Sequence, residues 1–445
     1  MLGGTLLDSV SRSTTTTIRR GFPKVARALL LPMVLASCIH NTRPARATHR
    51  TNYWEALAEL HPADAARVAQ SPSETEFAEA LGDLMAGAIE KAEDRFAKLR
   101  YSANDSVIRA GSRVVYTATL QYQEKWQQLS ALKAESTLTI AEQNDKASIE
   151  LWADAFKDAP PKVSTFKSST GRLQMSISEV GTPLVPVKIR NRTYNFWLDT
   201  GSSLTMIASD VAADLGVKPL VDDTLEIVTS TGRVTAQPAV IPQLTLGPLV
   251  VDNVPTMIVG ETSMQMRESR PSSFGGQVKI DGIIGFDIIR QVDLELDYVD
   301  GILRLRNPAI SRPDANRNLF WVGLPVIRIM SDEGIPLQFG LDTGAQLTFV
   351  TESLLEKLRI EPARIENRRV GGLGGEVSLR APVLPDLRVL VRGYPILFRG
   401  AFVRAPVYQV LASLDGVLGG DVWNSGIVRI DVTNGVFAIR KSRPQ

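Results

Sequence analysis

Two Asp-Thr-Gly triplets are the part of this 445-residue sequence best suited to chemistry. They begin at Asp199 and Asp342, and each follows a short apolar run, Phe-Trp-Leu in the first copy and Phe-Gly-Leu in the second. Such a run predicts a core strand, and the glycine allows a tight turn that presents the carboxylate at the end of the strand. The hydroxyls of Thr200 and Thr343 are expected to bond to backbone across the axis that relates the two copies. A single triplet is typical of an ordinary turn, so the duplication is the informative feature.

The scarcity of histidine and cysteine excludes the commoner kinds of catalytic and metal chemistry. The chain has three histidines, His40, His49 and His61, and one cysteine, Cys38. From residue 62 onward it therefore has no Ser-His-Asp triad, no cysteine nucleophile, no redox pair and no zinc site of the usual kind. If the protein is an enzyme, carboxylates, hydroxyls, lysines or backbone groups must carry its chemistry.

Each triplet belongs to a longer unit that occurs twice. A second motif, Asp281-Gly-Ile-Ile-Gly285, is matched by Asp415-Gly-Val-Leu-Gly419, and short Val-, Ile- and Leu-rich runs lie between turn residues. This pattern predicts an all-β region of about 270 residues built from two copies of one small unit. After each triplet we expect a strand and a short helix, at 204–207 and 208–215 in the first copy and at 347–350 and 352–358 in the second. The first copy has about nine extra residues between its motifs, and we expect them within 261–277.

The triplets, together with Ile283-Ile284-Gly285 and Val417-Leu418-Gly419, resemble those of the aspartic proteases, over about residues 176 to 441. The resemblance implies a mainly β, bilobal aspartic-protease fold of two pseudo-symmetric, retropepsin-like lobes. It also implies that Asp199 and Asp342 are catalytic: they share one proton and activate a water that attacks a peptide carbonyl. The supporting active-site loops would be Thr200, Gly201 and Ser202 in the first copy and Thr343, Gly344 and Ala345 in the second. No metal and no cofactor are expected.

Each copy has a glycine-containing hairpin candidate between its motifs, where the flap of this family covers the substrate. The candidate flap residues are Ser230, Thr231 and Gly232 in the first copy and Gly371, Gly372, Gly374 and Gly375 in the second. Pepsin-like enzymes have one flap, whereas retropepsins are dimers of a short lobe and have two. The chain therefore resembles a retropepsin dimer fused into one polypeptide. For the glycine-rich hairpin, an ordinary surface loop is the alternative.

The sequence departs from the family pattern in two ways. Neither candidate flap has a tyrosine, so no pepsin-type flap tyrosine is assigned. Ala345 stands where the first copy has Ser202, and one carboxylate is thus expected to lose a hydroxyl donor to its charged form. We therefore expect an activity optimum nearer neutrality than that of a pepsin. Asp281 and Asp415 are expected to be turn and cap residues rather than catalytic ones.

The first 38 residues are predicted to be an export signal with a lipobox. Basic residues precede a short apolar run, 28–36, which is too short to span a bilayer. Leu35-Ala36-Ser37-Cys38 resembles a bacterial lipobox, in which Cys38 becomes lipidated. An ordinary signal peptide with an incidental Cys38 is the alternative. Arg19-Arg20 also resembles a twin-arginine export motif. The mature chain is expected in the periplasm or cell envelope, anchored to a membrane.

The region that precedes the β units has helical periodicity. Apolar residues such as Phe77, Leu81 and Leu84 recur at steps of three and four from Tyr53 to about Pro160. Part of this region resembles a tetratricopeptide repeat, and a plain helical bundle or spacer is the alternative. The predicted domains are the export signal (1–38), an α-helical domain (39–158), a linker (159–175), protease lobe 1 (176–310) and protease lobe 2 (311–445).

The predicted function is that of an exported aspartic endopeptidase acting on extended protein or peptide substrates. The formal charge of +2 gives no electrostatic reason to expect nucleic acid as a partner. The expected partners are the substrate, a membrane through the lipid anchor, and a protein at the helical region, and the chain is expected to be monomeric. One alternative is a catalytically silent protease-fold lipoprotein that serves as a binding or scaffold module. Another is a protease that cuts only its own linker, within 159–171.

Overall fold

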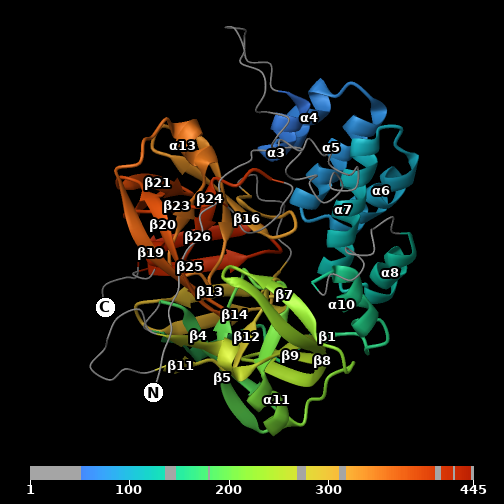
Figure 1. Cartoon of the computed structure of the whole chain (residues 1–445), viewed down its shortest axis with the longest axis vertical. Helices are drawn as coiled ribbons and strands as arrows, with labels where there is room; N and C mark the ends of the chain where they lie inside the picture. The colour runs from blue at the N-terminus through green and yellow to red at the C-terminus, as the bar shows by residue number, and fades with distance from the viewer. Residues whose placement is uncertain are drawn as a thin grey trace, which may run out of the picture.

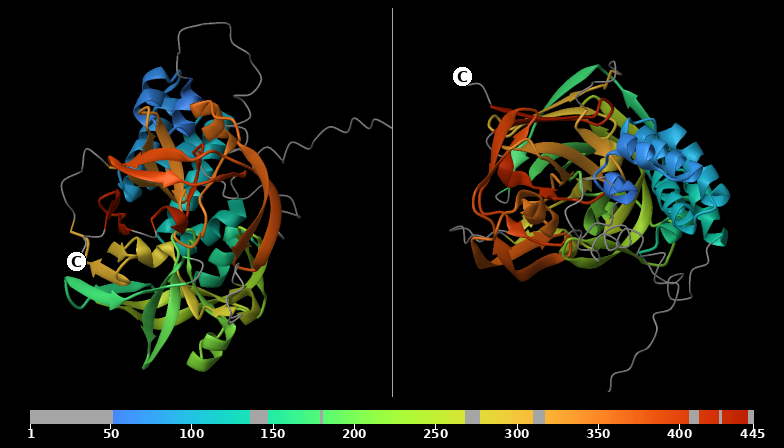
Figure 2. Two further views of the ribbon diagram at one scale, coloured as in Figure 1. Left: turned by 90° about the vertical axis from the view of Figure 1, so that its left-hand side faces the viewer. Right: turned by 90° about the horizontal axis from the view of Figure 1, so that it is seen from above.

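Two β lobes make up most of the molecule, and a group of helices runs along one flank of both (Figures 1 and 2). The computed structural model describes residues 52–135, 147–178, 181–267, 277–309, 317–405, 412–423 and 426–441. The expected mainly β, bilobal fold with a preceding helical region is confirmed. The predicted export signal, Cys38 included, lies outside the described residues. No helix in the described ranges is long and apolar enough to cross a membrane.

The helical region forms where the sequence shows helical periodicity. Its elements are α3 (Tyr53–Ala58), α4 (Pro62–Val68), α5 (Pro72–Met85), α6 (Ile89–Ser102), α7 (Ser106–Tyr122), α8 (Trp126–Ala131), the 3-10 helix η1 (Leu132–Glu135) and α10 (Ile149–Phe156). Asn52 caps α3 in a capping box with Glu55, and the Asp105 side chain caps α7. The apolar stripe of α5 is buried, and Phe77 meets Phe96 of α6 edge to face at 5.3 Å.

Lobe 1 is built on a nine-stranded sheet. Its strands are β1 (Val163–Phe166), β3 (Ser176–Ile177), β4 (Pro183–Ile189), β5 (Arg192–Leu198), β6 (Thr205–Ala208), β7 (Leu225–Thr229), β8 (Gly232–Leu246), β9 (Leu249–Val259) and β12 (Gly282–Ile284). Two short helices, α11 (Ser209–Leu215) and α12 (Phe286–Ile289), complete it. The predicted insertion, 261–277, contains η2 (Glu261–Met264) and β10 (Gln265–Arg267), and β10 pairs with β11 (Gln277–Lys279).

Lobe 2 repeats this plan in a ten-stranded sheet. Its elements are β15 (Leu319–Trp321), β16 (Pro325–Ser331), β17 (Pro336–Leu341), β18 (Phe349–Val350), α13 (Glu352–Leu358), β19 (Arg364–Gly372), β20 (Gly375–Val383), β21 (Leu387–Val391), β22 (Tyr394–Phe398), β23 (Phe402–Val403), β24 (Gly416–Leu418) and η3 (Gly420–Val422). The parallel pair β5–β12 corresponds to β17–β24, and the parallel pair β6–β9 corresponds to β18–β23. The strands and helices expected after the triplets are β6, α11, β18 and α13.

A five-stranded sheet joins the lobes, in the order β2 (Thr170–Gln174), β14 (Ile302–Arg306), β13 (Asp293–Asp297), β25 (Gly426–Asp431) and β26 (Val436–Lys441). The prediction that 159–175 is a linker is wrong, because this stretch forms β1, which pairs with β9, and β2, which pairs with β14. Most side chains of both strands are exposed, so they lack the apolar alternation that marks a buried strand. The predicted boundary between the lobes, at residues 310 and 311, lies outside the described residues.

Candidate active site

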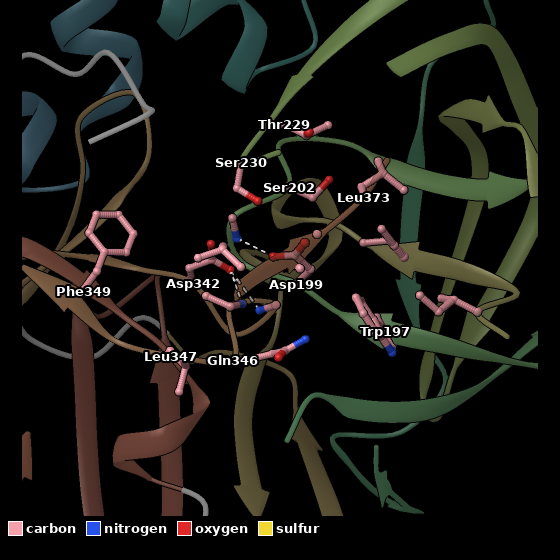
Figure 3. A pocket seen from close by; sticks show the side chains of 18 of the residues that line it. Trp197, Asp199, Ser202, Thr229, Ser230, Asp342, Gln346, Leu347, Phe349 and Leu373 are labelled. Carbon is pink, nitrogen blue, oxygen red and sulfur yellow. Dashed lines mark hydrogen bonds between the residues drawn. The ribbon is translucent and has the colours of Figure 1, made fainter. Parts of the chain in front are cut away.

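The two Asp-Thr-Gly loops meet between the lobes, each at the end of a core strand. Asp199 follows β5, and its amide donates to the carbonyl of Ile284 at 3.0 Å. Asp342 follows β17, and its amide donates to the carbonyl of Leu418 at 3.2 Å. The second motif of each lobe, which forms β12 or β24, therefore fixes the strand end that presents the carboxylate. Asp199 and Asp342 point toward one another in the centre of the site (Figure 3).

The two threonines hold the loops together across the pseudo-twofold axis. The Thr200 hydroxyl donates to the Leu341 carbonyl, and the Thr343 hydroxyl donates to the Leu198 carbonyl, both at 2.7 Å. Each hydroxyl also accepts the amide of the other threonine at 3.0 Å. Both threonines are buried, at 1% exposure, so these four bonds are shielded from water. The loops are thereby locked in one relative position, as expected from the sequence.

The glycine of each triplet lies against the carboxylate of the opposite lobe. A Cβ added to Gly201 would lie 2.7 Å from Cγ of Asp342, and a Cβ added to Gly344 would lie 2.5 Å from Cγ of Asp199. No side chain fits at such distances. The glycines are therefore required because each carboxylate packs directly against the opposite loop, in addition to allowing the turn.

Each carboxylate accepts backbone amides of its own loop. Asp199 Oδ1 accepts the amide of Gly201 at 2.8 Å, and Asp342 Oδ1 accepts those of Gly344 at 3.0 Å and Ala345 at 2.9 Å. Burial, followed by the charge of Asp342, raises the pKa of Asp199 well above the usual range for aspartate. The pair therefore retains a proton at a pH where a solvated aspartate has lost it.

The prediction that one carboxylate lacks a hydroxyl donor because Ala345 stands in the place of Ser202 is wrong. The Ser202 hydroxyl donates to the carbonyl of Leu204 at 2.8 Å and serves the loop rather than Asp199. In the second loop the backbone amide of Ala345 supplies a bond to Asp342, and this bond needs no side chain. The side-chain change therefore removes no donor from a carboxylate.

Both candidate flaps form hairpins, and their tips meet above the aspartates. Thr231, between β7 and β8, donates its hydroxyl to the carbonyl of Leu373, between β19 and β20, at 2.7 Å. Gly372 packs so tightly that an added Cβ would lie 2.5 Å from the Ser230 Oγ. At Gly374 a Cβ would lie 2.4 Å from Val234, and its φ of +94° also favours glycine. The structure thus brings all seven candidate flap residues to two touching hairpins.

The space between dyad and flaps is a cleft of about 130 Å³ with a mostly apolar lining. Its apolar side chains include Trp197, Met206 and Ile283 from lobe 1 and Leu347, Phe349 and Phe402 from lobe 2. Ser230 and Leu373 lie above the aspartates, and Trp197 and Phe349 lie on opposite sides of them (Figure 3). An apolar lining of this kind strengthens the electrostatic effect of the dyad on a bound group.

Two threonine–aspartate pairs, in which both threonines are buried, were not predicted from the sequence. Thr205 donates to Asp287 at 3.0 Å, and Thr348 donates to Asp421 at 2.7 Å. The hydroxyls also accept the amides of the second-motif glycines, Gly285 at 3.3 Å and Gly419 at 3.1 Å, and so brace the strands beneath the dyad. Burial raises the pKa of Asp287, and desolvation of the carboxyl raises the pKa of Asp421. The signal was present, since each residue recurs at the same offset as the neighbouring motif.

Asp281 and Asp415 lie away from the dyad and have structural partners. Asp281 accepts the amide of Asn195 at 2.9 Å, and Asp415 accepts the amide of Gln338 at 2.8 Å. Asp415 is fully buried and also accepts Lys357 at 2.9 Å. In the described part of the chain, no group of three or more His, Cys, Asp or Glu side chains is placed to hold a metal ion.

Two regions of the chain, 185–288 and 327–422, each match the family model for aspartyl proteases. Each match spans the triplet, the flap hairpin and the second motif of one lobe. The two lobes are therefore similar in sequence to aspartyl proteases, and their tandem arrangement is consistent with a two-lobed member of that family. No match was found among curated proteins.

Proposed function

We propose that the protein is an aspartic endopeptidase that hydrolyses peptide bonds of extended protein or peptide substrates. The observation that carries this proposal is the pair of converging carboxylates, Asp199 and Asp342, on the floor of a cleft that two flaps cover. Fixed loops, a raised pKa of Asp199 and an apolar lining are what a protein needs to hold a proton and a water at one point.

In the proposed mechanism the pair begins with one proton and a water between the carboxylates. The ionised carboxylate takes a proton from the water as its oxygen bonds to the substrate carbonyl carbon. The protonated carboxyl donates its proton to the carbonyl oxygen, which gives a neutral tetrahedral intermediate. Breakdown of this intermediate breaks the C–N bond: the leaving nitrogen takes a proton from the dyad, and one hydroxyl of the intermediate gives its proton to the ionised carboxylate as the carbonyl re-forms. The pair ends with one proton, as it began.

The experiment that tests this proposal uses residues 39–445 and their Asp199→Asn and Asp342→Asn variants. Each is offered unfolded protein and a mixed peptide library, and cleavage is followed by mass spectrometry. We expect cleavage by the unsubstituted protein and a loss of at least about 10³-fold in each variant. Activity that survives both substitutions would refute the assignment. Binding of a pepstatin-type inhibitor without cleavage of any substrate would favour the silent binding module instead.

We also propose that the protein is exported and anchored through a lipid on Cys38. The support is the lipobox-like sequence that ends at Cys38 and the basic residues before its apolar run. Labelling with a fatty-acid analogue in bacterial cells tests this: the native chain should be labelled and sediment with membranes, and Cys38→Ala should do neither. Equal labelling of both chains would contradict the anchor.

A further inference from the structure

Two arginines line the cleft, and both come from lobe 2. Arg369 lies on flap strand β19, and Arg404 follows β23. Among the described residues that line the cleft, these and the dyad are the charged ones. Arg369 is 71% exposed and pairs with Glu376 of its own hairpin at 3.5 Å, so it faces solvent. Arg404 is half-buried.

The cation of Arg404 has no counterpart in lobe 1. The register of the parallel strands shows which residues of the two lobes correspond. In lobe 2, Phe349 of β18 pairs with Phe402 of β23. In lobe 1, Met206 of β6 pairs with Met257 of β9 in the same way. Two residues further on, lobe 2 has Arg404 and lobe 1 has Val259, which is fully buried. A cleft that is otherwise built from two related halves therefore has this charge on one side. Such a charge distinguishes the two ends of a bound peptide.

Arg404 also reaches across the cleft to the flap of lobe 1. Its Nη2 donates to the carbonyl of Ser230 at 2.7 Å, and its Cζ lies 5.8 Å from the centre of the Phe349 ring. Ser230 is at the flap tip, above the aspartates (Figure 3). The guanidinium thus links the lobe 2 wall of the cleft to the flap that closes over it.

We propose that Arg404 is a specificity-determining residue that binds an acidic side chain of the substrate on the lobe 2 side of the cleft. A guanidinium has five N–H donors in a planar fork, so it can bond a carboxylate and a flap carbonyl together. Substrate recognition would then stabilise the closed flap. The substrate class is a protein or peptide segment with Asp or Glu on one side of the cleaved bond. This inference rests on the proposed proteolytic function.

The test compares cleavage of a mixed peptide library by the native chain and by Arg404→Gln. We expect Asp or Glu to be enriched at one fixed position beside the cut with the native chain, and not with the variant. For two peptides that differ only by Glu or Gln there, the ratio of kcat/KM values should fall from about tenfold to about one. Arg404→Glu should prefer Lys at this position, and Arg404→Lys should retain part of the acidic preference. Arg399→Gln, an exposed arginine outside the cleft, should retain all of it.

The ratio of the kcat/KM values for the Glu and Gln peptides separates charge recognition from loss of the flap bond, because loss of that bond alone would slow cleavage of both peptides equally. Cleavage by the native chain without an acidic preference, or a preference that persists in Arg404→Gln, would overturn this inference and leave the proteolytic function standing. If the native chain cleaves no more of the library than its Asp199→Asn variant does, the proposed function fails, and this inference fails with it.

Discussion

Thr231 of the lobe 1 flap donates its hydroxyl to the carbonyl of Leu373 in the lobe 2 flap at 2.7 Å. The lobe 2 flap has a second hydrogen bond with lobe 1, because the amide of Gly374 donates to the carbonyl of Ser263 at 3.2 Å. The two hairpins therefore close the cleft as a single cover. In the proposed function, a substrate that enters from the flap side would break these bonds and would be held when they form again.

Replacing Thr231 with Val should weaken substrate binding. The substitution keeps the shape of the side chain and removes the bond to Leu373, which contributes about 0.5–1.5 kcal/mol, together with the longer bond to the Thr229 hydroxyl within the same hairpin. We expect KM for a cleaved peptide to rise about two- to tenfold, with a smaller change in kcat. Thr231→Ser retains the hydroxyl and should behave like the native chain. Equal KM values for all three proteins would show that the bond does not contribute to closure.

Replacing Gly344 with Ala should separate the two carboxylates. Its added Cβ would lie 2.5 Å from Cγ of Asp199, so either the loop or the aspartate must move. Misplacement of catalytic groups by about 1 Å can cost about 10²-fold in rate, and we expect kcat to fall by at least this much. Gly260→Ala is the matched control, because nothing lies within 4 Å of its added Cβ. Native activity in Gly344→Ala would contradict the requirement for close approach.

The sequence predicted the dyad, the second motifs and the two hairpins because all of them belong to a repeat. Asp199 and Asp342 lie in matched surroundings, and matched residues of two homologous units meet at the axis that relates the units. The cross-axis bonds of Thr200 and Thr343 follow from the same symmetry. The repeat therefore supplied tertiary information that a single copy would not have contained.

The features that the sequence did not predict are those in which the two copies differ or in which other segments take part. Arg404 bonds a carbonyl at Ser230, and no residue-type pattern marks a backbone acceptor that lies 174 positions away. The Ser202 hydroxyl could be assigned to Asp199 or to its own loop, and only the side-chain orientation decides between them. Strands β1 and β2 form because sheet edges are available to them, and their own residues carry little strand signal.

Cleavage should have a bell-shaped pH dependence whose upper limb lies above the usual aspartate range. The proposed reaction needs one proton on the pair, and burial together with the charge of Asp342 raises the pKa of Asp199. Activity should therefore persist as pH rises past about 4 and fall as the pair loses its last proton. The profile of kcat/KM against pH for one peptide measures this. An optimum near pH 2–3 would contradict the raised pKa.

Asp199→Asn should stabilise the fold at neutral pH while it abolishes activity. Because the folded-state pKa of Asp199 is raised, its carboxyl favours folding below the unfolded pKa, about 3.9. This contribution is lost as pH rises through the folded-state pKa. Asparagine does not titrate, so the stability of the variant does not fall in this way as pH rises. We expect its Tm to exceed that of the native chain by about 2 °C at pH 7.5, and the difference to shrink toward pH 4. A Tm difference that does not depend on pH would contradict this linkage.

Tyr122 joins the helical region to both lobes behind the dyad loops. Its ring centre lies 4.3 Å from that of Trp321 in lobe 2 and 6.5 Å from that of Phe286 in lobe 1. The Arg290 guanidinium lies 4.2 Å from the Tyr122 ring centre, and the ring lines a small pocket together with Thr200 of the catalytic loop.

Tyr122→Ala should therefore lower both stability and turnover. The substitution leaves a cavity between the lobes, and we expect the free energy of unfolding to fall by about 2–4 kcal/mol. Because the cavity adjoins Thr200, whose bonds lock the dyad loops, kcat should also fall at temperatures where the variant is folded. Tyr101→Ala is the control on helix α6, since its ring is 63% exposed and it should change neither quantity. Equal Tm and kcat values for the two variants would show that the helical region only covers the lobes. A fall in Tm and kcat confined to Tyr122→Ala would show that the helical region helps to hold the dyad loops in place.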